Sequence, residues 1–119
     1  MKKNSPLVFI AALLIYAPIA FACDYPPRAN VPNGQTATKQ EMIDAQKTVK
    51  AYMAAVEEYL ACIEAAENDA IKEMQDPAEG VLQQRQEMLG KKHNAAVEEM
   101  EIVAAKFNNE VRAYKAQSE

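Results

Sequence analysis

The feature that most constrains the fold is a long segment without glycine or proline, which runs from Thr38 to Asp76. It is rich in Ala, Glu, Lys, Gln and Met, which are strong helix formers. Thr38 and Glu41 have the spacing of a capping box, in which each side chain accepts a hydrogen bond from the backbone N–H of the other residue. Apolar residues then recur at intervals of three and four, as they do on one face of a helix. The segment therefore predicts one helix over about 38–75.

A second helical pattern begins at Asp76 and Pro77, because Asp suits the N-cap and Pro suits the first helical position. Its apolar stripe extends to Tyr114, which predicts a helix over about 77–117. A break near Gly90 is left open, because Gly costs about 1 kcal/mol against Ala inside a helix. Such a short connection makes the two helices antiparallel neighbours. We therefore predict an all-α fold, a coiled-coil-like antiparallel two-helix hairpin over residues 38–119.

The charge pattern supports a particular register of this hairpin. The first helix has no Lys or Arg between Lys50 and Lys72, whereas the facing part of the second helix carries Arg85, Lys91 and Lys92. Each exposed pair contributes only about 0–1 kcal/mol, so the pattern checks the register more than it stabilises the fold. The expected contacts are Met53 with Met100, Val56 with Val97, and Leu60 with His93.

Residues 1–22 have the three-part layout of a secretory signal peptide. Lys2 and Lys3 precede the almost wholly apolar run from Leu7 to Ile19, and Ala20-Phe21-Ala22 is a small-x-small cleavage site. Removing residues 1–22, which include two lysines, from a chain of 119 residues with 13 basic and 17 acidic ones leaves 97 residues, 11 of them basic, and a net charge of −6. This size indicates one small domain, and the charge disfavours nucleic acid as a partner. We expect a periplasmic protein cleaved after Ala22.

The segment between this leader and the first helix, residues 23–37, is an arm rich in helix breakers. Pro26-Pro27 favours extended polyproline II, and Pro32-Asn33-Gly34 is typical of a turn. The arm can extend about 46 Å at about 3.1 Å per residue, and the helix from Thr38 to Cys62 rises about 36 Å. The arm is therefore long enough to run back along the helix and form a disulfide between Cys23 and Cys62. The even number of cysteines in an exported chain favours this pairing.

Lipidation is the alternative for Cys23, because a Cys directly after a leader is the position at which bacterial lipoproteins are acylated. The usual lipobox resembles Leu-Ala-Gly, and Ala20 and Phe21 depart from it. We therefore favour the disulfide. If Cys23 is acylated instead, the chain is a lipid-anchored envelope protein, and this is the one case in which we expect a membrane partner.

Four aromatic residues widen the two apolar stripes and form a predicted interaction face. Tyr52 and Tyr59 lie seven residues apart on the first helix, as do Phe107 and Tyr114 on the second. A stripe wider than one partner helix can cover marks an interface or a covering segment. The sequence leaves two candidates for the element that covers the stripes. Either a second hairpin completes a four-helix bundle as a homodimer, or the arm covers the surplus with Tyr25 packed along the groove.

The sequence contains no arrangement typical of catalysis or of metal and cofactor binding. The single histidine, His93, has only Leu, Gly, Ala and Val at the neighbouring helical positions, so it lacks a second ligand and is expected to pack at the hairpin interface. The methionines suit adaptable core packing, and no Ser or Thr has a base nearby in sequence. We therefore predict no catalytic residue, no metal, no cofactor and no enzyme activity.

Six segments carry a resemblance to known sequences: Cys23-Asp24-Tyr25-Pro26, Pro32-Asn33-Gly34, Thr36-Ala37-Thr38-Lys39, Tyr59-Leu60-Ala61-Cys62, Asn94-Ala95-Ala96-Val97-Glu98 and Val111-Arg112-Ala113-Tyr114-Lys115. Together they resemble an uncharacterised group of small exported helical proteins of Gram-negative bacteria. The likeness covers the arm, the first half of the first helix and the second half of the second. It implies export and a helical body, and it brings no activity and no site residues.

We therefore expect an exported structural or protein-interaction module that acts through its helix faces on a protein partner whose identity the sequence does not disclose. A homodimer is one form of that partner. The alternatives are a lipid-anchored envelope protein and a helical periplasmic chaperone-like binder of unfolded clients. The first alternative depends on acylation of Cys23, and the second on an apolar groove that is open to clients.

Overall fold

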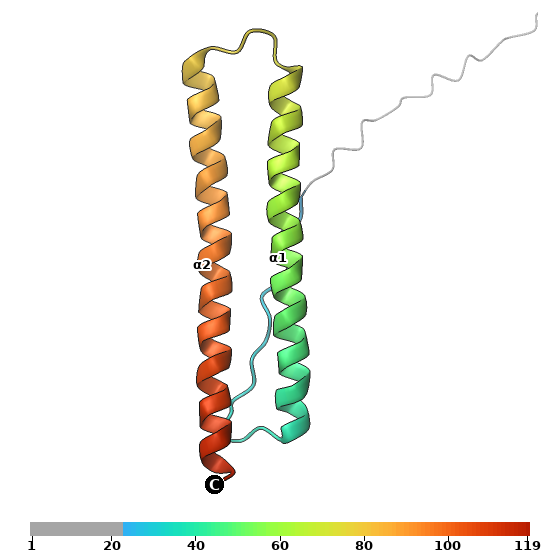
Figure 1. The fold of residues 1–119 in the computed structure, drawn as a ribbon, viewed down its shortest axis with the longest axis vertical. Helices are drawn as coiled ribbons and strands as arrows, with labels where there is room; N and C mark the ends of the chain where they lie inside the picture. Colours follow the sequence, from blue (N-terminus) through green and yellow to red (C-terminus); the bar gives the residue numbers. More distant parts are fainter. Residues whose placement is uncertain (1–22) are drawn as a thin grey trace, which may run out of the picture.

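The computed structural model describes residues 23–119, so the predicted signal peptide over residues 1–22 lies outside the described part of the chain. Two long helices, α1 (Lys39–Glu73) and α2 (Glu79–Gln117), lie side by side and run in opposite directions (Figure 1). No strand is found among the described residues. The predicted all-α, antiparallel two-helix hairpin is therefore confirmed.

The beginning of α1 has the local chemistry that its sequence predicts. The Thr38 hydroxyl accepts a hydrogen bond from the Glu41 N–H at 3.2 Å, and the Glu41 carboxylate accepts one from the Thr38 N–H at 2.7 Å. Both halves of the capping box are thus present. Because each bond satisfies a backbone donor that the first turn cannot satisfy itself, the box defines where α1 begins.

The connection between the helices differs from the prediction. α1 ends at Glu73 and α2 begins at Glu79, so Pro77 is not the first residue of the second helix. Asp76 is not an N-cap either: it has a positive φ of 44°, and Ala78 occupies the cap position without a side-chain hydrogen bond. The physical reason is that Asp tolerates the left-handed region, so Asp76 can form part of the turn itself, and α2 begins only after Pro77 and Ala78.

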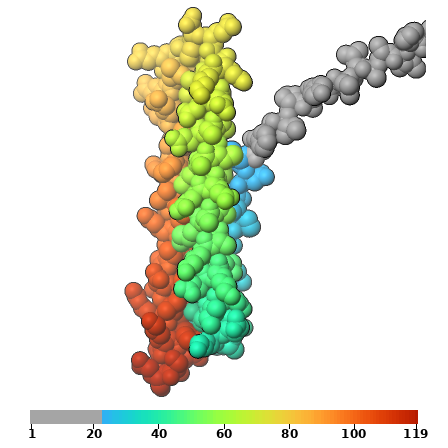
Figure 2. Space-filling model, turned by 45° about the vertical axis from the view of Figure 1, so that its right-hand side comes forward, coloured from blue at the N-terminus to red at the C-terminus, as the bar shows by residue number. Residues whose placement is uncertain are grey.

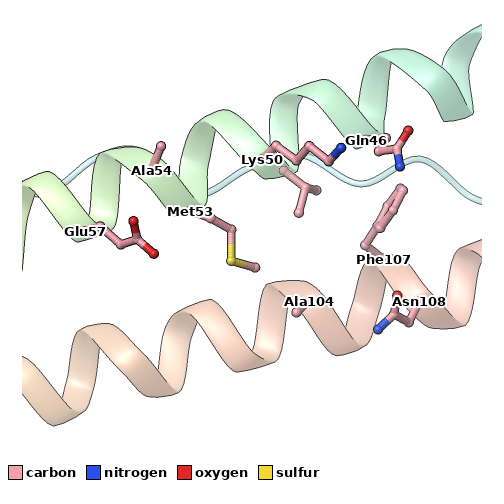
Figure 3. Close-up of a pocket in the computed structure, with 9 residues that line it drawn as sticks. Gln46, Lys50, Met53, Ala54, Glu57, Ala104, Phe107 and Asn108 are labelled. Atoms are coloured by element: carbon pink, nitrogen blue, oxygen red, sulfur yellow. The ribbon is translucent and has the colours of Figure 1, made fainter.

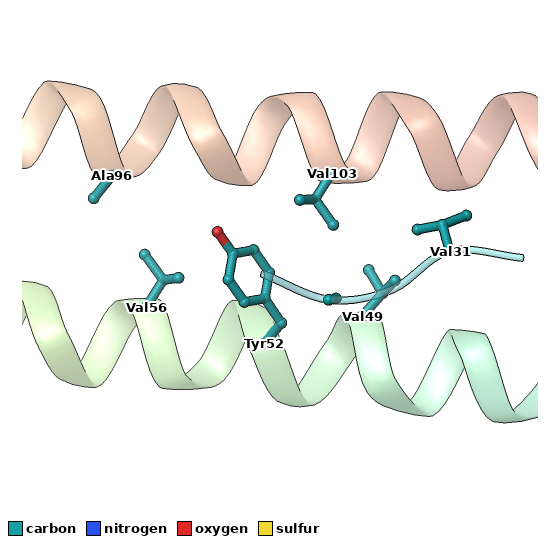
Figure 4. Close-up of a cluster of buried hydrophobic side chains, with 7 residues drawn as sticks. Val31, Val49, Tyr52, Val56, Ala96 and Val103 are labelled. Atoms are coloured by element: carbon teal, nitrogen blue, oxygen red, sulfur yellow. The ribbon is translucent and has the colours of Figure 1, made fainter. Parts of the chain in front are cut away.

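The second helix is continuous through Gly90, which settles the break that the sequence left open. The core explains why one glycine does not interrupt it. Val56 is fully buried, and Ala96 and Val103 are each 2% exposed (Figure 4). Burial of a Val side chain contributes about 1.5–3 kcal/mol, which exceeds the cost of about 1 kcal/mol for one glycine in a helix.

The register of the hairpin agrees closely with the prediction. Figure 4 shows Val56 across from Ala96, one residue from the expected partner Val97. Nearer the connection, the Arg85 Nε donates to the Glu67 carboxylate at 2.7 Å, and its Nη2 donates to the second carboxylate oxygen at 3.0 Å. This two-pronged, half-buried ion pair joins the acidic stretch of α1 to the basic stretch of α2.

The arm adds a third layer to the hairpin and contributes to its core. It runs back along the helices and lies against the flank of the hairpin (Figures 1 and 2). Ala29 and Val31 are 9% and 8% exposed and belong to the same buried cluster as Val49 and Val56. The core of this small domain therefore consists of two helices and an extended segment.

Hydrogen bonds attach the C-terminal part of the arm to the end of α2. The predicted turn is present, because the Asn33 side chain accepts a hydrogen bond from the Gln35 N–H at 2.9 Å. Next to it, the Gly34 N–H donates to the Glu110 carboxylate at 2.6 Å. The Gln117 amide donates to the carbonyl oxygens of Gly34 and Ala37, at 2.7 and 3.0 Å. The open end of the hairpin is thus closed by the arm.

Gly34 and Gly90 provide a matched pair of substitutions that tests this attachment. A Cβ atom at Gly34 would lie 1.9 Å from the backbone oxygen of Glu110, whereas a Cβ at Gly90 would meet nothing within 4 Å. We expect Gly34→Ala to lower the free energy of unfolding by about 1–3 kcal/mol, because backbone must move away from backbone. Gly90→Ala should raise it by about 1 kcal/mol through helix propensity alone. Urea unfolding measures both, and an unchanged midpoint for Gly34→Ala would contradict the close packing of the arm on α2.

Candidate interaction surface

The N-terminal end of the arm is fixed by a covalent bond. Cys23 and Cys62 form a disulfide, with an S–S distance of 1.97 Å and Cα atoms 5.8 Å apart, so the predicted pairing is confirmed. The bond closes a loop across a sequence separation of 39 residues. The chain-entropy relation gives about 4 kcal/mol of stabilisation for a loop of that size. The same sulfur of Cys23 would be needed for acylation, so the bonded form and a thioether-linked lipid exclude each other.

Tyr25 places the arm on the flank of α1 that carries Tyr52 and Tyr59. The hydroxyls of Tyr25 and Tyr52 lie 3.0 Å apart, and the ring of Tyr25 meets the ring of Tyr59 edge-on with centroids 5.0 Å apart. Tyr52 is only 4% exposed. Edge-to-face pairs of this kind contribute about 0.5–1.5 kcal/mol beyond area burial. On this flank, the arm is what covers the surplus apolar surface.

An ion pair joins the same part of the arm to α2. The Arg28 guanidinium donates to the Glu99 carboxylate, with the Nε atom 2.9 Å from the oxygen. Both side chains are partly exposed to solvent, at 54% for Arg28 and 38% for Glu99. The pair therefore contributes little to stability, about 0–1 kcal/mol, and its main effect is to orient the arm across both helices.

A groove between α1 and α2 lies away from the arm. Its central part has a volume of about 440 Å³, and Met53 of α1 and Phe107 of α2 point into it (Figure 3). A second part of about 280 Å³ shares Gln46 and Phe107 with the first and continues toward the beginning of α1 and the end of α2. We call this continuous surface the open groove. It is lined by Met42, Ile43, Gln46, Val49, Lys50, Met53, Ala54, Glu57, Ala104, Phe107, Asn108, Val111 and Tyr114, and by Lys39 at its edge.

The four aromatic residues of the predicted interaction face lie on two different faces. Tyr52 is buried beneath the arm, and Tyr59 is half-buried against Tyr25, so the arm already covers this pair. Phe107 and Tyr114 are half-buried and line the open groove. That these residues contact a partner stays a prediction, and the structure assigns the free surface to the second pair.

The sequence pattern does not single out Ile43, which lines the wall of the open groove that α1 forms. Ile43 is 37% exposed and lies next to Met42, which continues the apolar spacing of three and four along α1. The available signal was the pair of adjacent apolar residues at Met42 and Ile43, because two neighbours on a helix point about 100° apart and widen the apolar face.

His93 lies at the surface, so the expectation that it packs at the hairpin interface is wrong. It is exposed and lines a shallow site with Glu64, Gln86 and Leu89. Leu60, its expected partner, packs instead against the buried cluster. The physical reason is the orientation of α2, which points the 2%-exposed Ala96 at the core and leaves His93, about 60° around the helix, at the surface.

The described residues contain no group of three or more His, Cys, Asp or Glu side chains that could hold a metal ion. Within the same part of the chain, no helix is long and apolar enough to span a membrane. The expected absence of a catalytic or cofactor site stays a prediction. Comparison of the chain with protein-family models, with curated proteins and with solved structures found no match.

The contacts of Tyr25 predict that the stability contributed by the arm depends on pH in the alkaline range. Burial against the helix, followed by the hydrogen bond to Tyr52, raises the pKa of Tyr25 from 10.0 to about 12. Tyr25 as a whole residue is 43% exposed, but its hydroxyl lies 3.0 Å from the hydroxyl of the buried Tyr52. The folded state therefore favours the protonated phenol. This contribution to stability is fully present below pH 10.0 and is lost as the pH rises through about 12.

We expect the stability advantage of the wild-type chain over Tyr25→Phe to shrink as the pH rises from neutrality to about 11. Urea unfolding at a series of pH values measures it. Tyr114→Phe, which removes a phenol from the open groove instead, is the matched control. An advantage over Tyr25→Phe that stays constant across this range would contradict the assignment.

Proposed function

We propose that this chain is an exported protein-interaction module that binds an amphipathic helix in the open groove. The observation that carries the proposal is the difference between the two faces of the hairpin. A covalently attached arm covers one face, and an apolar groove with exposed Ile43 and half-buried Phe107 remains uncovered on the other. An uncovered apolar surface with a polar rim is typical of a recognition site.

The shape of the groove favours a helix as the bound element. Two antiparallel helices present a straight channel between them, and a third helix packs on such a channel at interaxial distances of about 8–10 Å. Apolar residues occupy the floor of the groove, and Gln46, Lys50, Glu57 and Asn108 form its polar rim. An amphipathic helix matches this arrangement with an apolar stripe and polar flanks.

Two observations support an oxidising, exported location. A disulfide is typical of compartments outside the cytoplasm, and the Cys23–Cys62 bond is integral to the packing of the arm. Residues 1–22 have the composition of a signal peptide that ends at Ala22, directly before Cys23. The proposal therefore locates the mature chain in the periplasm.

The intact mass of the purified protein tests this location. We expect a chain that begins at Cys23 and that is lighter than its reduced form by two hydrogen atoms. A mass raised by acyl chains would identify the lipid-anchored alternative instead. Retention of residues 1–22 would contradict cleavage, and a mass unaffected by a reducing agent would contradict the disulfide.

Site-specific photocrosslinking in the living cell tests the groove. A photoreactive benzoylphenylalanine at Asn108, on the rim, should give adducts of one or a few discrete masses, because a specific partner contacts that position. The same residue at Glu98, an exposed position of α2 that does not line the open groove, is the matched control. Equal labelling at both positions, or none at Asn108, would refute the proposal. A continuum of adduct masses at Asn108 would indicate the chaperone-like binding of many clients.

A further inference from the structure

We propose that the outer flank of α2 is a dimer interface, on which α2 of a second copy of this chain packs antiparallel about a two-fold axis at Ala95. This flank is separate from the open groove, so the inference goes beyond the proposed function and does not depend on it. Three observations carry it: a line of exposed apolar residues along α2, the charges that flank this line, and the position of the arm.

The first observation is an exposed apolar line on α2. Val81, Met88 and Ile102 are 43, 54 and 44% exposed, and they are three of the five large apolar residues that are exposed among residues 23–119. Ala95 lies between them on the same line and is exposed as well. We call these four residues the apolar line. Apolar residues scattered singly over a surface are ordinary, whereas a continuous line of them indicates a contact surface.

The spacing of the apolar line is that of a left-handed coiled coil. Its members are seven residues apart, at positions 81, 88, 95 and 102. A strict seven-residue repeat drifts by about 20° per repeat around a straight helix. Two helices that cross at about 20° follow this drift and keep such a line in contact along its length. The element that fits the apolar line is therefore another helix, packed side by side with α2.

The apolar line is placed so that a second helix fits beside α2 without entering the hairpin. Ala95 and Ile102 each precede a residue of the buried face, Ala96 and Val103, which are both 2% exposed. Because successive helical residues point about 100° apart, the line faces away from the core between α1 and α2. A second α2 on this line therefore leaves both α1 helices on the outer sides of the pair.

The second observation is the order of charges on the two flanks of the apolar line. Lys91 and Glu98 are seven residues apart on one flank, Lys92 and Glu99 are seven apart on the other, and both pairs are centred close to Ala95. An antiparallel two-fold arrangement about Ala95 therefore sets Lys91 of each copy opposite Glu98 of the other, and Lys92 opposite Glu99. A parallel arrangement would set lysine beside lysine and glutamate beside glutamate, which is unfavourable.

These charged groups are available to a second copy. Lys91, Lys92 and Glu98 take part in none of the ion pairs found among residues 23–119. Glu99 accepts hydrogen bonds from Arg28 at its Oε2 atom alone, so its Oε1 atom remains for a lysine of the second copy. The antiparallel pair thus adds contacts between the copies without breaking one within either copy.

The same axis pairs the apolar line with itself. Met88 of each copy meets Ile102 of the other, because both lie seven residues from Ala95. The two copies of Ala95 meet at the axis, where small side chains allow the helices to approach closely. Val81 meets Asn109, the next position of the seven-residue repeat, and the apolar contact ends there. A surface that pairs with itself in this way gives a closed dimer.

The third observation is the position of the arm. Its hydrogen bonds with α2 involve Glu99, Glu110 and Gln117, which all follow Ala95 in the sequence. Figure 1 shows the arm along the half of the hairpin that contains the end of α2. In the antiparallel pair, the end of α2 of one copy lies beside the beginning of α2 of the other. The two arms therefore lie at opposite ends of the dimer and do not collide.

Charge exchange tests the antiparallel register, with dimerisation measured by sedimentation equilibrium of the mature chain at low salt, where the charges are least screened. Lys91→Glu and Glu98→Lys should each raise the dimer dissociation constant about tenfold, because each replaces two attractive contacts by two repulsive ones. The double variant should return it to within about twofold of the wild-type value. Glu101→Lys, about 120° around α2 from Ala95, and Lys47→Glu on α1 are exposed matched controls that should leave it unchanged.

Two exposed isoleucines test the apolar line and distinguish it from the open groove. Ile102→Ser should raise the dimer dissociation constant at least about tenfold, because it removes two apolar contacts across the axis. Ile43→Ser, at an exposed isoleucine of the open groove, is the matched control and should leave the constant unchanged. A dimer weakened by Ile43→Ser and not by Ile102→Ser would refute this interface. A chain that stays monomeric at every concentration would refute the dimer itself.

A cysteine placed at the axis gives an independent measurement of the register. Ala95→Cys should form an intermolecular disulfide on mild oxidation, visible by non-reducing electrophoresis, because the two copies of position 95 meet. Asn109→Cys, at an exposed position of the same repeat, is the matched control. Its two copies would be about 42 Å apart along the helices, which is beyond disulfide reach. Crosslinking of Asn109→Cys as efficient as that of Ala95→Cys would overturn the proposed axis.

Discussion

The attachment of the arm at both of its ends is the constraint on which the rest of this structure depends. The Cys23–Cys62 disulfide fixes one end about two thirds of the way along α1, and hydrogen bonds from Gly34 and Gln117 fix the other at the end of α2. Held between these points, the arm inserts Ala29 and Val31 into the buried cluster. Two helices alone form a thin core, and small domains usually need such a staple.

This constraint also makes the molecule one-sided. The two helices bear apolar residues toward both grooves of the hairpin, and the arm fills only one of them. The disulfide makes displacement of the arm from the hairpin unfavourable. Even a displaced arm stays attached to α1 at Cys62, so its residues remain close to the surface that they cover. Tyr52 and Tyr59 are consequently committed to internal packing, whereas Phe107 and Tyr114 remain available. The covalent bond thereby determines which face stays uncovered.

The elements that the sequence predicts correctly are those governed by local chemistry or by chain length. The capping box at Thr38 is a local hydrogen-bond pattern, and the reach of the arm to Cys62 follows from residue counts. The connection was predicted wrongly, because an Asp-Pro pair fits both a helix N-terminus and a left-handed turn before a proline. The choice between them depends on how the two helices align, which is a long-range property.

The open groove could be predicted only in part, for a related reason. The aromatic residues show that the stripes are too wide for one partner helix. They do not show into which of the two grooves the arm folds. Both grooves of a hairpin look alike in the sequence pattern. The side of the hairpin along which the arm runs from Cys23 to Thr38 decides between them, and this is a property of the three-dimensional structure. Ile43 was overlooked because its neighbour Met42 already satisfied the helical period.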